Sequence, residues 1–99
     1  MAVVLDFNGI GVSQSQYEQV LHEVNPDGKL APGVLFHAAG PSGDGWRVVE
    51  VWESQELLDQ FFKEKLQEAL QRANINAQPE VFQVINLWPV ANADQASLW

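Results

Sequence analysis

Two ionisable side chains near the middle of the chain have the types and spacing needed for acid–base chemistry. His37 lies at the centre of one predicted strand, and Glu50 lies at the centre of the next. If these strands pair, the carboxylate can hold the imidazole in one tautomer, and such a histidine serves as a base near neutral pH. Glu50, or with less support Asp6, is the alternative base. A histidine–carboxylate pair is also a common structural hydrogen-bond network, so both interpretations stay open.

Aromatic and polar side chains on the same strands could form the wall of a ligand site. Trp46 and Trp52 flank Glu50 on one strand, at the even spacing that puts all three on one face of a sheet. Such rings stack on aromatic ligands, although they are more often plain core. The polar side chains that we assign to the same ligand site are Asp6, Asn8 and Gln83.

Composition narrows the functional classes. The chain has 99 residues, a net charge of −8 and 46% hydrophobic residues. Its acidity opposes binding to nucleic acid or to an anionic membrane. The absence of cysteine excludes disulfides and thiolate chemistry, and the few histidines and carboxylates predict no metal centre. The N-terminal apolar run is interrupted by Asp6 and lacks a basic flank, so we expect a soluble, cytoplasmic protein without a signal peptide.

Hydrophobic periodicity predicts six elements in one domain, residues 1–99. Alternating apolar residues predict four strands, over residues 2–8, 33–39, 45–53 and 80–87. The glycine-rich segment 40–45 has turn chemistry throughout, so it joins the second and third strands into a hairpin. Residues 89–99 form a C-terminal tail without periodicity.

Two helices lie between these strands. The first starts at the N-cap Ser13, where Gln16 completes a capping box, and it stops at Asn25. The second starts at the N-cap Ser54 and carries an apolar stripe as far as Ala73. The element order is therefore βαββαβ.

This order is that of a ferredoxin-like α+β fold, a four-stranded antiparallel sheet with both helices on one face. We assign the helix-covered face to the cleaner apolar sets Val3, Leu5, Phe7, Val34, Phe36, Ala38, Val49, Val51, Phe82 and Val84. The opposite face then holds His37 and Glu50 among many apolar side chains. Because that face is too apolar for water, we expect a second copy to cover it, giving a homodimeric α/β barrel with the site between the two sheets.

The segment from Phe36 to Ser54, FHAAGPSGDGWRVVEVWES, resembles small proteins of the dimeric α/β-barrel superfamily related to antibiotic-biosynthesis monooxygenases. The resemblance implies this fold and a homodimer. It implies little about chemistry, because the superfamily includes cofactor-independent oxygenases, haem-degrading enzymes, isomerases and proteins without assigned activity. Haem-degrading relatives carry an asparagine that Asn8 matches, but Phe61 and Gln71 stand where they have a tryptophan and the haem-ligating histidine. We therefore expect no haem and no other cofactor.

Two functions stay open at this point. The first, slightly favoured because the sequence shows no complete catalytic constellation, is a protein that binds a small apolar or aromatic molecule in the inter-sheet cavity. The second is a cofactor-independent monooxygenase or proton-transfer enzyme acting on an aromatic or polyketide-like substrate, with His37 or Glu50 as base. A cavity that connects His37 with solvent would favour the enzyme.

Overall fold

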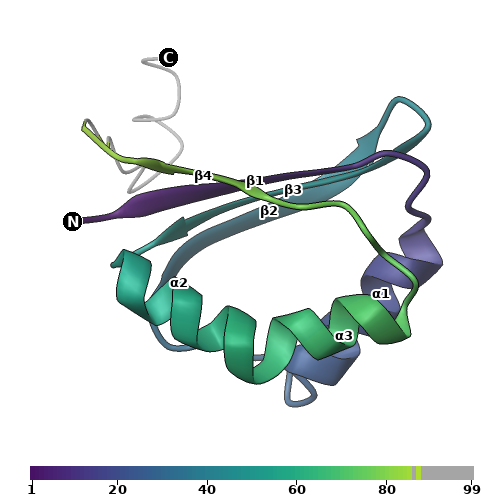
Figure 1. Cartoon of the computed structure of the whole chain (residues 1–99), viewed down its shortest axis with the longest axis horizontal. Helices are drawn as coiled ribbons and strands as arrows, with labels where there is room; N and C mark the ends of the chain where they lie inside the picture. Colours follow the sequence, from purple (N-terminus) through teal and green to yellow (C-terminus); the bar gives the residue numbers. More distant parts are fainter. Residues whose placement is uncertain (86, 88–99) are drawn as a thin grey trace.

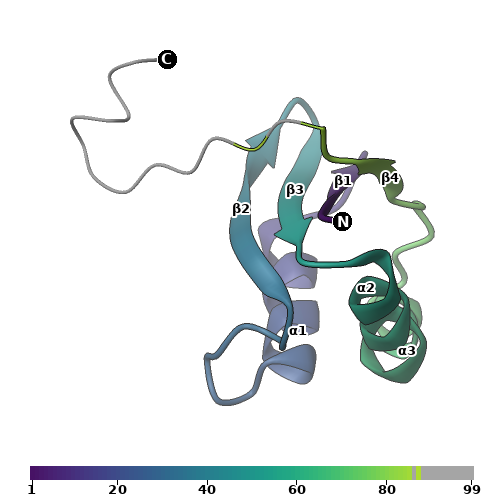
Figure 2. The same cartoon turned by 90° about the vertical axis from the view of Figure 1, so that its left-hand side faces the viewer.

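The computed structural model describes residues 1–85 and 87, and it confirms the predicted order of strands and helices. The elements are β1 (Val3–Gly9), α1 (Gln14–Val24), β2 (Val34–Ser42), β3 (Gly45–Trp52), α2 (Gln55–Phe61), a π-helical turn (Phe62–Leu66), α3 (Gln67–Arg72) and β4 (Glu80–Gln83) (Figure 1). The strands form one antiparallel sheet in the order β2-β3-β1-β4. All helical segments lie on one face of this sheet, so the fold is ferredoxin-like α+β (Figure 2). The predicted tail, 89–99, lies outside the described residues.

Both helices start where the sequence predicts. The Ser13 hydroxyl accepts a hydrogen bond from Gln16 N at 3.1 Å, and the Gln16 side chain accepts one from Ser13 N at 2.9 Å. The Ser54 hydroxyl accepts from Leu57 N at 3.2 Å. These bonds satisfy backbone N–H groups that have no partner within the first helical turn. The caps thus determine where α1 and α2 begin relative to the strands before them.

The hairpin between β2 and β3 is tighter than predicted. Its turn consists of Gly43 and Asp44 alone, and Ser42 pairs directly with Gly45. Gly43 has a φ of +56°, a left-handed conformation that a two-residue hairpin turn requires and that glycine adopts without strain. Strand β2 therefore extends to Ser42, beyond its predicted end. Independently of this turn, β4 ends at Gln83 and is shorter than predicted.

The second predicted helix contains one π-helical turn between α2 and α3. The backbone N–H of Gln67 donates to the carbonyl of Phe62, five residues earlier. In a regular α-helix, residues five apart point about 140° away from each other. The wider π turn instead allows Phe61 and Leu66 to line the same internal cavity. Two large apolar side chains thereby reach one site from positions that α-helical spacing would separate.

The predicted side is wrong for β3, for β4 and for β2 from Phe36 onward, whereas Val34 pairs with the buried Trp52 and packs against the core as predicted. β1 buries Val3, Leu5 and Phe7 as predicted. However, Glu50 lies opposite Leu5 and His37 lies opposite Glu50, and directly paired residues share a face of the sheet. The side chains that share the helix-covered face with the β1 set are Val34, His37, Ala39, Trp46, Val48, Glu50, Trp52, Val81 and Gln83. The prediction failed because β2 and β3 are apolar on both faces, so alternation alone does not determine which face turns inward.

The opposite side of the sheet is called the outer sheet face here. It consists of Val4, Asp6, Asn8, Phe36, Ala38, Arg47, Val49, Val51, Glu80 and Phe82. Phe36 and Phe82 are 53% and 57% exposed, and Arg47 donates two hydrogen bonds to the carboxylate of Asp6, at 3.1 and 3.0 Å. Within the described part of the chain, every helix lies on the other side (Figure 2). None of the described helices has the length and apolar character of a membrane span.

Candidate functional site

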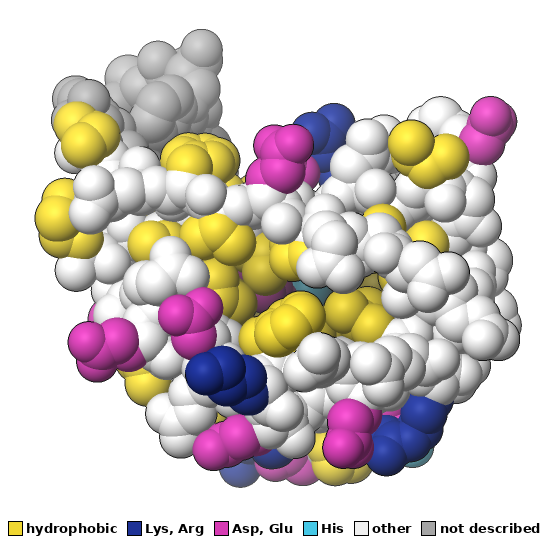
Figure 3. Space-filling view, viewed as in Figure 1, with side chains coloured by type: hydrophobic (Ala, Val, Ile, Leu, Met, Phe, Trp, Pro, Cys, Tyr) yellow, Lys and Arg dark blue, Asp and Glu magenta, His cyan; other side chains and the backbone are white. Residues whose placement is uncertain are grey.

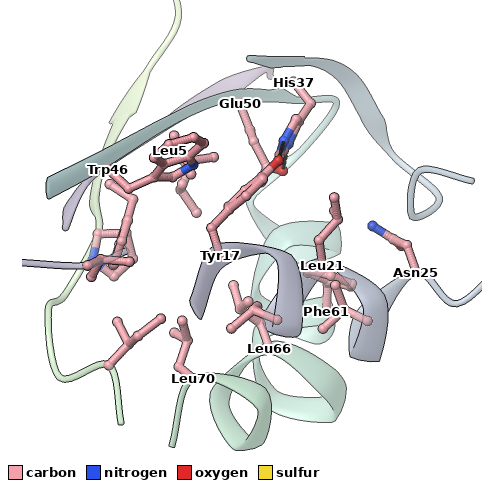
Figure 4. Close-up of a pocket in the computed structure, with 17 residues that line it drawn as sticks. Leu5, Tyr17, Leu21, Asn25, His37, Trp46, Glu50, Phe61, Leu66 and Leu70 are labelled. Carbon is pink, nitrogen blue, oxygen red and sulfur yellow. Dashed lines mark hydrogen bonds and ion pairs between the residues drawn. The ribbon is translucent and has the colours of Figure 1, made fainter. Parts of the chain in front are cut away.

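Three polar side chains form a continuous hydrogen-bonded chain between the sheet and α1. The hydroxyl of Tyr17, on α1, lies 2.8 Å from Nε2 of His37 on β2. Nδ1 of His37 lies 2.6 Å from Oε2 of Glu50 on the neighbouring strand β3. Figure 4 shows Tyr17 reaching up from the helix to meet the other two, which come from the sheet. We refer to these three residues as the Tyr–His–Glu relay.

The hydrogen-bond partners determine which atoms of the relay carry protons. Oε1 of Glu50 accepts a hydrogen bond at 3.0 Å from Nε1 of Trp52, which is completely buried. A carboxylate can only accept, so its second oxygen accepts a hydrogen bond from the Nδ1–H of His37. Nε2 of His37 is then the acceptor, and the Tyr17 hydroxyl donates to it. Because the His37 and Glu50 side chains are only 18% and 13% exposed, this arrangement is shielded from most of the competing water.

The relay keeps Tyr17 in its neutral form. Burial raises the pKa of Tyr17 above its ordinary value of about 10, and the nearby negative charge of Glu50 raises it further. The charge of Glu18 contributes in the same direction. A neutral tyrosine beside a histidine acceptor can give up its own proton to the imidazole while its oxygen receives another one.

A mainly apolar cavity of about 80 Å³ lies between the sheet and the helices, and all three relay residues line it. Its apolar wall includes Leu5, Phe7, Val20, Leu66, Leu70 and Ile75. Figure 3 shows apolar side chains gathered in the hollow between the edge of the sheet at β4 and the helices below it. For scale, an engineered cavity of about 150 Å³ holds benzene. The space therefore accepts a small group, and a whole aromatic ring needs either side-chain movement or adjoining room.

Trp46 forms part of the wall next to the relay. Its ring packs on that of Tyr17, with centroids 5.3 Å apart and planes inclined by 33°. Its Nε1 is buried and has no hydrogen-bond partner among the residues that the structure describes. Buried N–H groups are nearly always paired, so this one is a donor available to a ligand oxygen or nitrogen.

The structure brings together four of the seven residues that the sequence assigns to a site. The cavity is lined by His37, Glu50 and Trp46, and the indole N–H of Trp52 donates a hydrogen bond to Glu50. The remaining three lie elsewhere. Asp6 and Asn8 point to the outer sheet face, where Asp6 pairs with Arg47, and Gln83 is exposed and donates to the sulfur of Met1 at the open end of β4. The site also lies within a single chain, between the sheet and the helices, in contrast to the predicted position between two sheets.

Sequence reasoning missed two residues of the site. Tyr17 falls at an apolar position of α1, in helical register with the buried Val20 and Val24, yet a buried tyrosine hydroxyl normally needs a partner, and this is the one tyrosine of the chain. That requirement was a usable signal. Phe61, whose ring packs on Trp52 at a centroid distance of 5.3 Å, faces the site beside Leu66 through the π turn, which residue spacing does not reveal. Within the described residues, no group of three or more histidines and carboxylates is placed to hold a metal ion.

The sheet order and the helices packed on one face define the fold of the antibiotic-biosynthesis-monooxygenase-like proteins, as the resemblance implied. Similar solved structures include a Chloroflexus aurantiacus protein provisionally named as such a monooxygenase, with 15% identity, coverage of 92% of this chain and 100% of that one, and a TM-score of 0.62. SnoaB, a cofactor-independent oxygenase from Streptomyces nogalater, has 14% identity, coverage of 90% and 96%, and a TM-score of 0.59. The hydroxynitrile lyase of Passiflora edulis has 15% identity, coverage of 89% and 96%, and a TM-score of 0.54.

At these identities the likeness establishes the fold and leaves the chemistry to be argued from the site. Neither a search against protein-family models nor a search of curated proteins finds a match for the sequence. The function proposed below therefore depends on the relay and its cavity.

Proposed function

We propose that the protein is an acid–base catalyst that moves a proton to or from a small, mainly apolar or aromatic substrate. One observation carries this proposal: the Tyr–His–Glu relay, with links of 2.8 and 2.6 Å, lines an apolar cavity. A purely structural network needs no cavity beside it. The outermost hydroxyl of this one lines a space where a substrate can reach it.

The direction of proton movement follows from the hydrogen bonds. A substrate C–H or O–H gives its proton to the oxygen of Tyr17 while the tyrosine proton passes to Nε2 of His37. The products are a substrate anion and an imidazolium ion that the carboxylate of Glu50 stabilises. Return of the proton to the same or another substrate atom restores the relay, so the cycle consumes no other reactant.

The cavity wall selects the substrate. Apart from the relay and Asn25 it is lined by apolar side chains, which favours hydrocarbon or aromatic groups over charged ones. The free N–H of Trp46 is suited to an oxygen that gains negative charge when the proton leaves. An acidic ketone, a phenol or a cyanohydrin with an aromatic group has these properties.

A cofactor-independent oxygenase is the second candidate, and the same apolar wall favours it. In such a reaction the substrate anion itself transfers electrons to molecular oxygen, so the protein supplies deprotonation and a space without bulk water. SnoaB, which shares the fold, is described as an oxygenase of this kind. The two candidates differ in whether oxygen is consumed.

We also propose that the outer sheet face is a homodimer interface. Phe36 and Phe82 are more than half exposed on a sheet face that no described helix covers, and exposed apolar surface of this kind normally marks an interface. Sedimentation equilibrium should give a dimer for the native chain and a monomer for Phe36→Asp. Ile10→Asp, at an even more exposed apolar position outside this face, should leave the dimer intact.

The direct test of the proton-transfer function uses 2-tetralone, an aromatic ketone with acidic C–H bonds, in deuterated water. Nuclear magnetic resonance should show faster loss of its α-protons with the native protein than in buffer. Tyr17→Phe and His37→Gln should each lower this acceleration by about 100-fold or more, the usual contribution of a positioned acid–base group. Glu56→Gln, in the exposed first turn of α2, should have no effect.

Three outcomes separate the candidate functions. Exchange without oxygen uptake supports proton transfer, whereas oxygen uptake measured with an electrode and coupled to ketone loss supports the oxygenase. Ketone binding without any accelerated exchange would leave a binding protein and contradict both enzymatic proposals.

A further inference from the structure

A second, larger hollow adjoins the cavity at the relay. It measures about 390 Å³ and is called the outer cavity here. Four residues line both spaces: Tyr17, Leu21, Asn25 and His37. Two of these belong to the relay, so the atoms proposed to exchange protons lie at the boundary between the two cavities. A ligand that extends through both would therefore pass directly by the reacting oxygen of Tyr17.

The two cavities differ in the chemistry of their walls. The inner one is apolar apart from the relay and Asn25, whereas Glu18, His22 and Lys29 are among the residues that line the outer one. Glu18 is the single carboxylate of the outer wall, and it accepts a hydrogen bond from the side chain of Gln14 at 3.1 Å. A ligand with an apolar part facing the inner cavity and a polar part in the outer cavity matches these two walls.

Lys29 is presented by a well-defined loop. Its backbone N–H donates to Oδ1 of Asp27 at 3.1 Å, and the N–H of Gly28 donates to the carbonyl of Asn25 at 3.0 Å. With its amide oriented to satisfy its neighbours, Asn25 also donates to the carbonyls of Val24 and Lys29, at 3.0 and 2.9 Å. Residues 25–29 thus form a hydrogen-bonded loop beside the outer cavity, and the acid nearest in sequence to Lys29 is engaged by backbone.

The charge of Lys29 is not neutralised by a neighbouring side chain. Both arginines of the chain form ion pairs, Arg47 with Asp6 and Arg72 with Glu23 and Glu68. Among the residues that the structure describes, Lys29 has no such carboxylate partner. The protein has a net charge of −8, so most of its surface repels anions. The unpaired ammonium group of Lys29 therefore makes the outer cavity a place where an anionic group of a ligand is attracted.

We infer that the outer cavity binds the anionic group of an aromatic carboxylate, with Lys29 as the residue that determines this preference. The aromatic group then lies at the boundary beside Leu21, mostly in the larger outer cavity with only its edge in the inner one, and the acidic bond of the substrate lies at Tyr17. This inference rests on the proposed function and adds to it the substrate class, an aromatic acid in place of a neutral apolar molecule.

The test compares two probes of the same shape, naphthalene-2-carboxylate and its neutral amide, by isothermal titration calorimetry. The native protein should bind the carboxylate about fivefold more tightly, the scale of a partly exposed ion pair. Lys29→Met should remove this preference and leave binding of the amide unchanged. Lys63→Met, an exposed lysine that lines neither cavity, removes the same charge and should retain the full preference.

Each other outcome overturns the inference. Equal binding of the two probes by the native protein, or a preference that survives in Lys29→Met, contradicts the role of Lys29 and leaves the proton-transfer function intact. Loss of the preference in Lys63→Met as well would assign it to overall charge. Failure of the native protein to bind either probe contradicts both this inference and the proposed aromatic substrate.

Discussion

Each face of the sheet carries a pair made of a basic and an acidic side chain, and the two pairs lie in different surroundings. On the helix-covered face, His37 and Glu50 meet at 2.6 Å with side chains 18% and 13% exposed. On the outer sheet face, Arg47 and Asp6 meet at 3.0 Å with side chains 49% and 26% exposed. The inner pair has further partners at both ends, Tyr17 and Trp52, whereas the outer pair is open to water. A basic and an acidic side chain in contact therefore do not by themselves define a site; burial, satisfied partners and an adjoining cavity do.

The largest difference is expected when one carboxylate is removed from each face. Glu50→Ala leaves the buried donors of His37 and Trp52 without an acceptor, so the free energy of unfolding should fall by about 2 to 4 kcal/mol. Asp6→Ala leaves an arginine that water can solvate, and it should cost far less. Urea unfolding of both variants at one protein concentration measures this. Equal losses would mean that Glu50 is as well solvated as Asp6.

A double-mutant cycle should give a smaller but more specific difference. Alanine at His37, at Glu50 and at both should yield a coupling free energy of about 1 to 3 kcal/mol, as expected for contacting residues in one network. This coupling should persist at about 1 M salt, where the Debye length is about 3 Å, because the pair is shielded from solvent. The matching cycle for Asp6 and Arg47 should give a weaker coupling that salt reduces further. A salt-sensitive inner coupling would contradict the burial of the relay.

The comparison also explains how much the sequence predicts. Local chemistry sufficed for the helix starts, because Ser13 and Ser54 satisfy backbone groups a few residues away. It failed for the position of Glu50, because strand alternation gives two sets of side chains and only the pairing of strands decides which set turns inward. Tyr17 joins the relay through a contact twenty residues distant, and Phe61 through a π turn, so both depend on tertiary structure. The order of strands and helices was enough to predict the fold. To predict the site, one must also know which residues pair between neighbouring strands.

Tyr17 offers a direct measurement of the inner environment, because no other tyrosine contributes to the signal. Burial raises its pKa and the charge of Glu50 adds to the rise, so the absorbance of tyrosinate should titrate above about pH 10. Since the folded pKa exceeds the unfolded one, this group's contribution to stability is present below about pH 10 and is lost as the pH rises. Glu50→Gln should lower the midpoint only in part, because burial is the larger cause. An unshifted midpoint in the native protein would place the hydroxyl in water.

The smallest expected effect lies on the outer sheet face, in acid. Hydrogen bonds from Arg47 hold the pKa of Asp6 below its ordinary value of 3.8, with the arginine charge acting in the same direction. The folded pKa is therefore below the unfolded one, so the unfolded state binds more protons as the pH falls through about 4, and the stability that this pair contributes is lost there. Asp6→Asn and Arg47→Met should each flatten the acid limb of the stability curve, measured by urea unfolding, to the same slight extent. A flattening in Asp6→Asn that Arg47→Met does not reproduce would show that the carboxylate is stabilised by something other than this arginine.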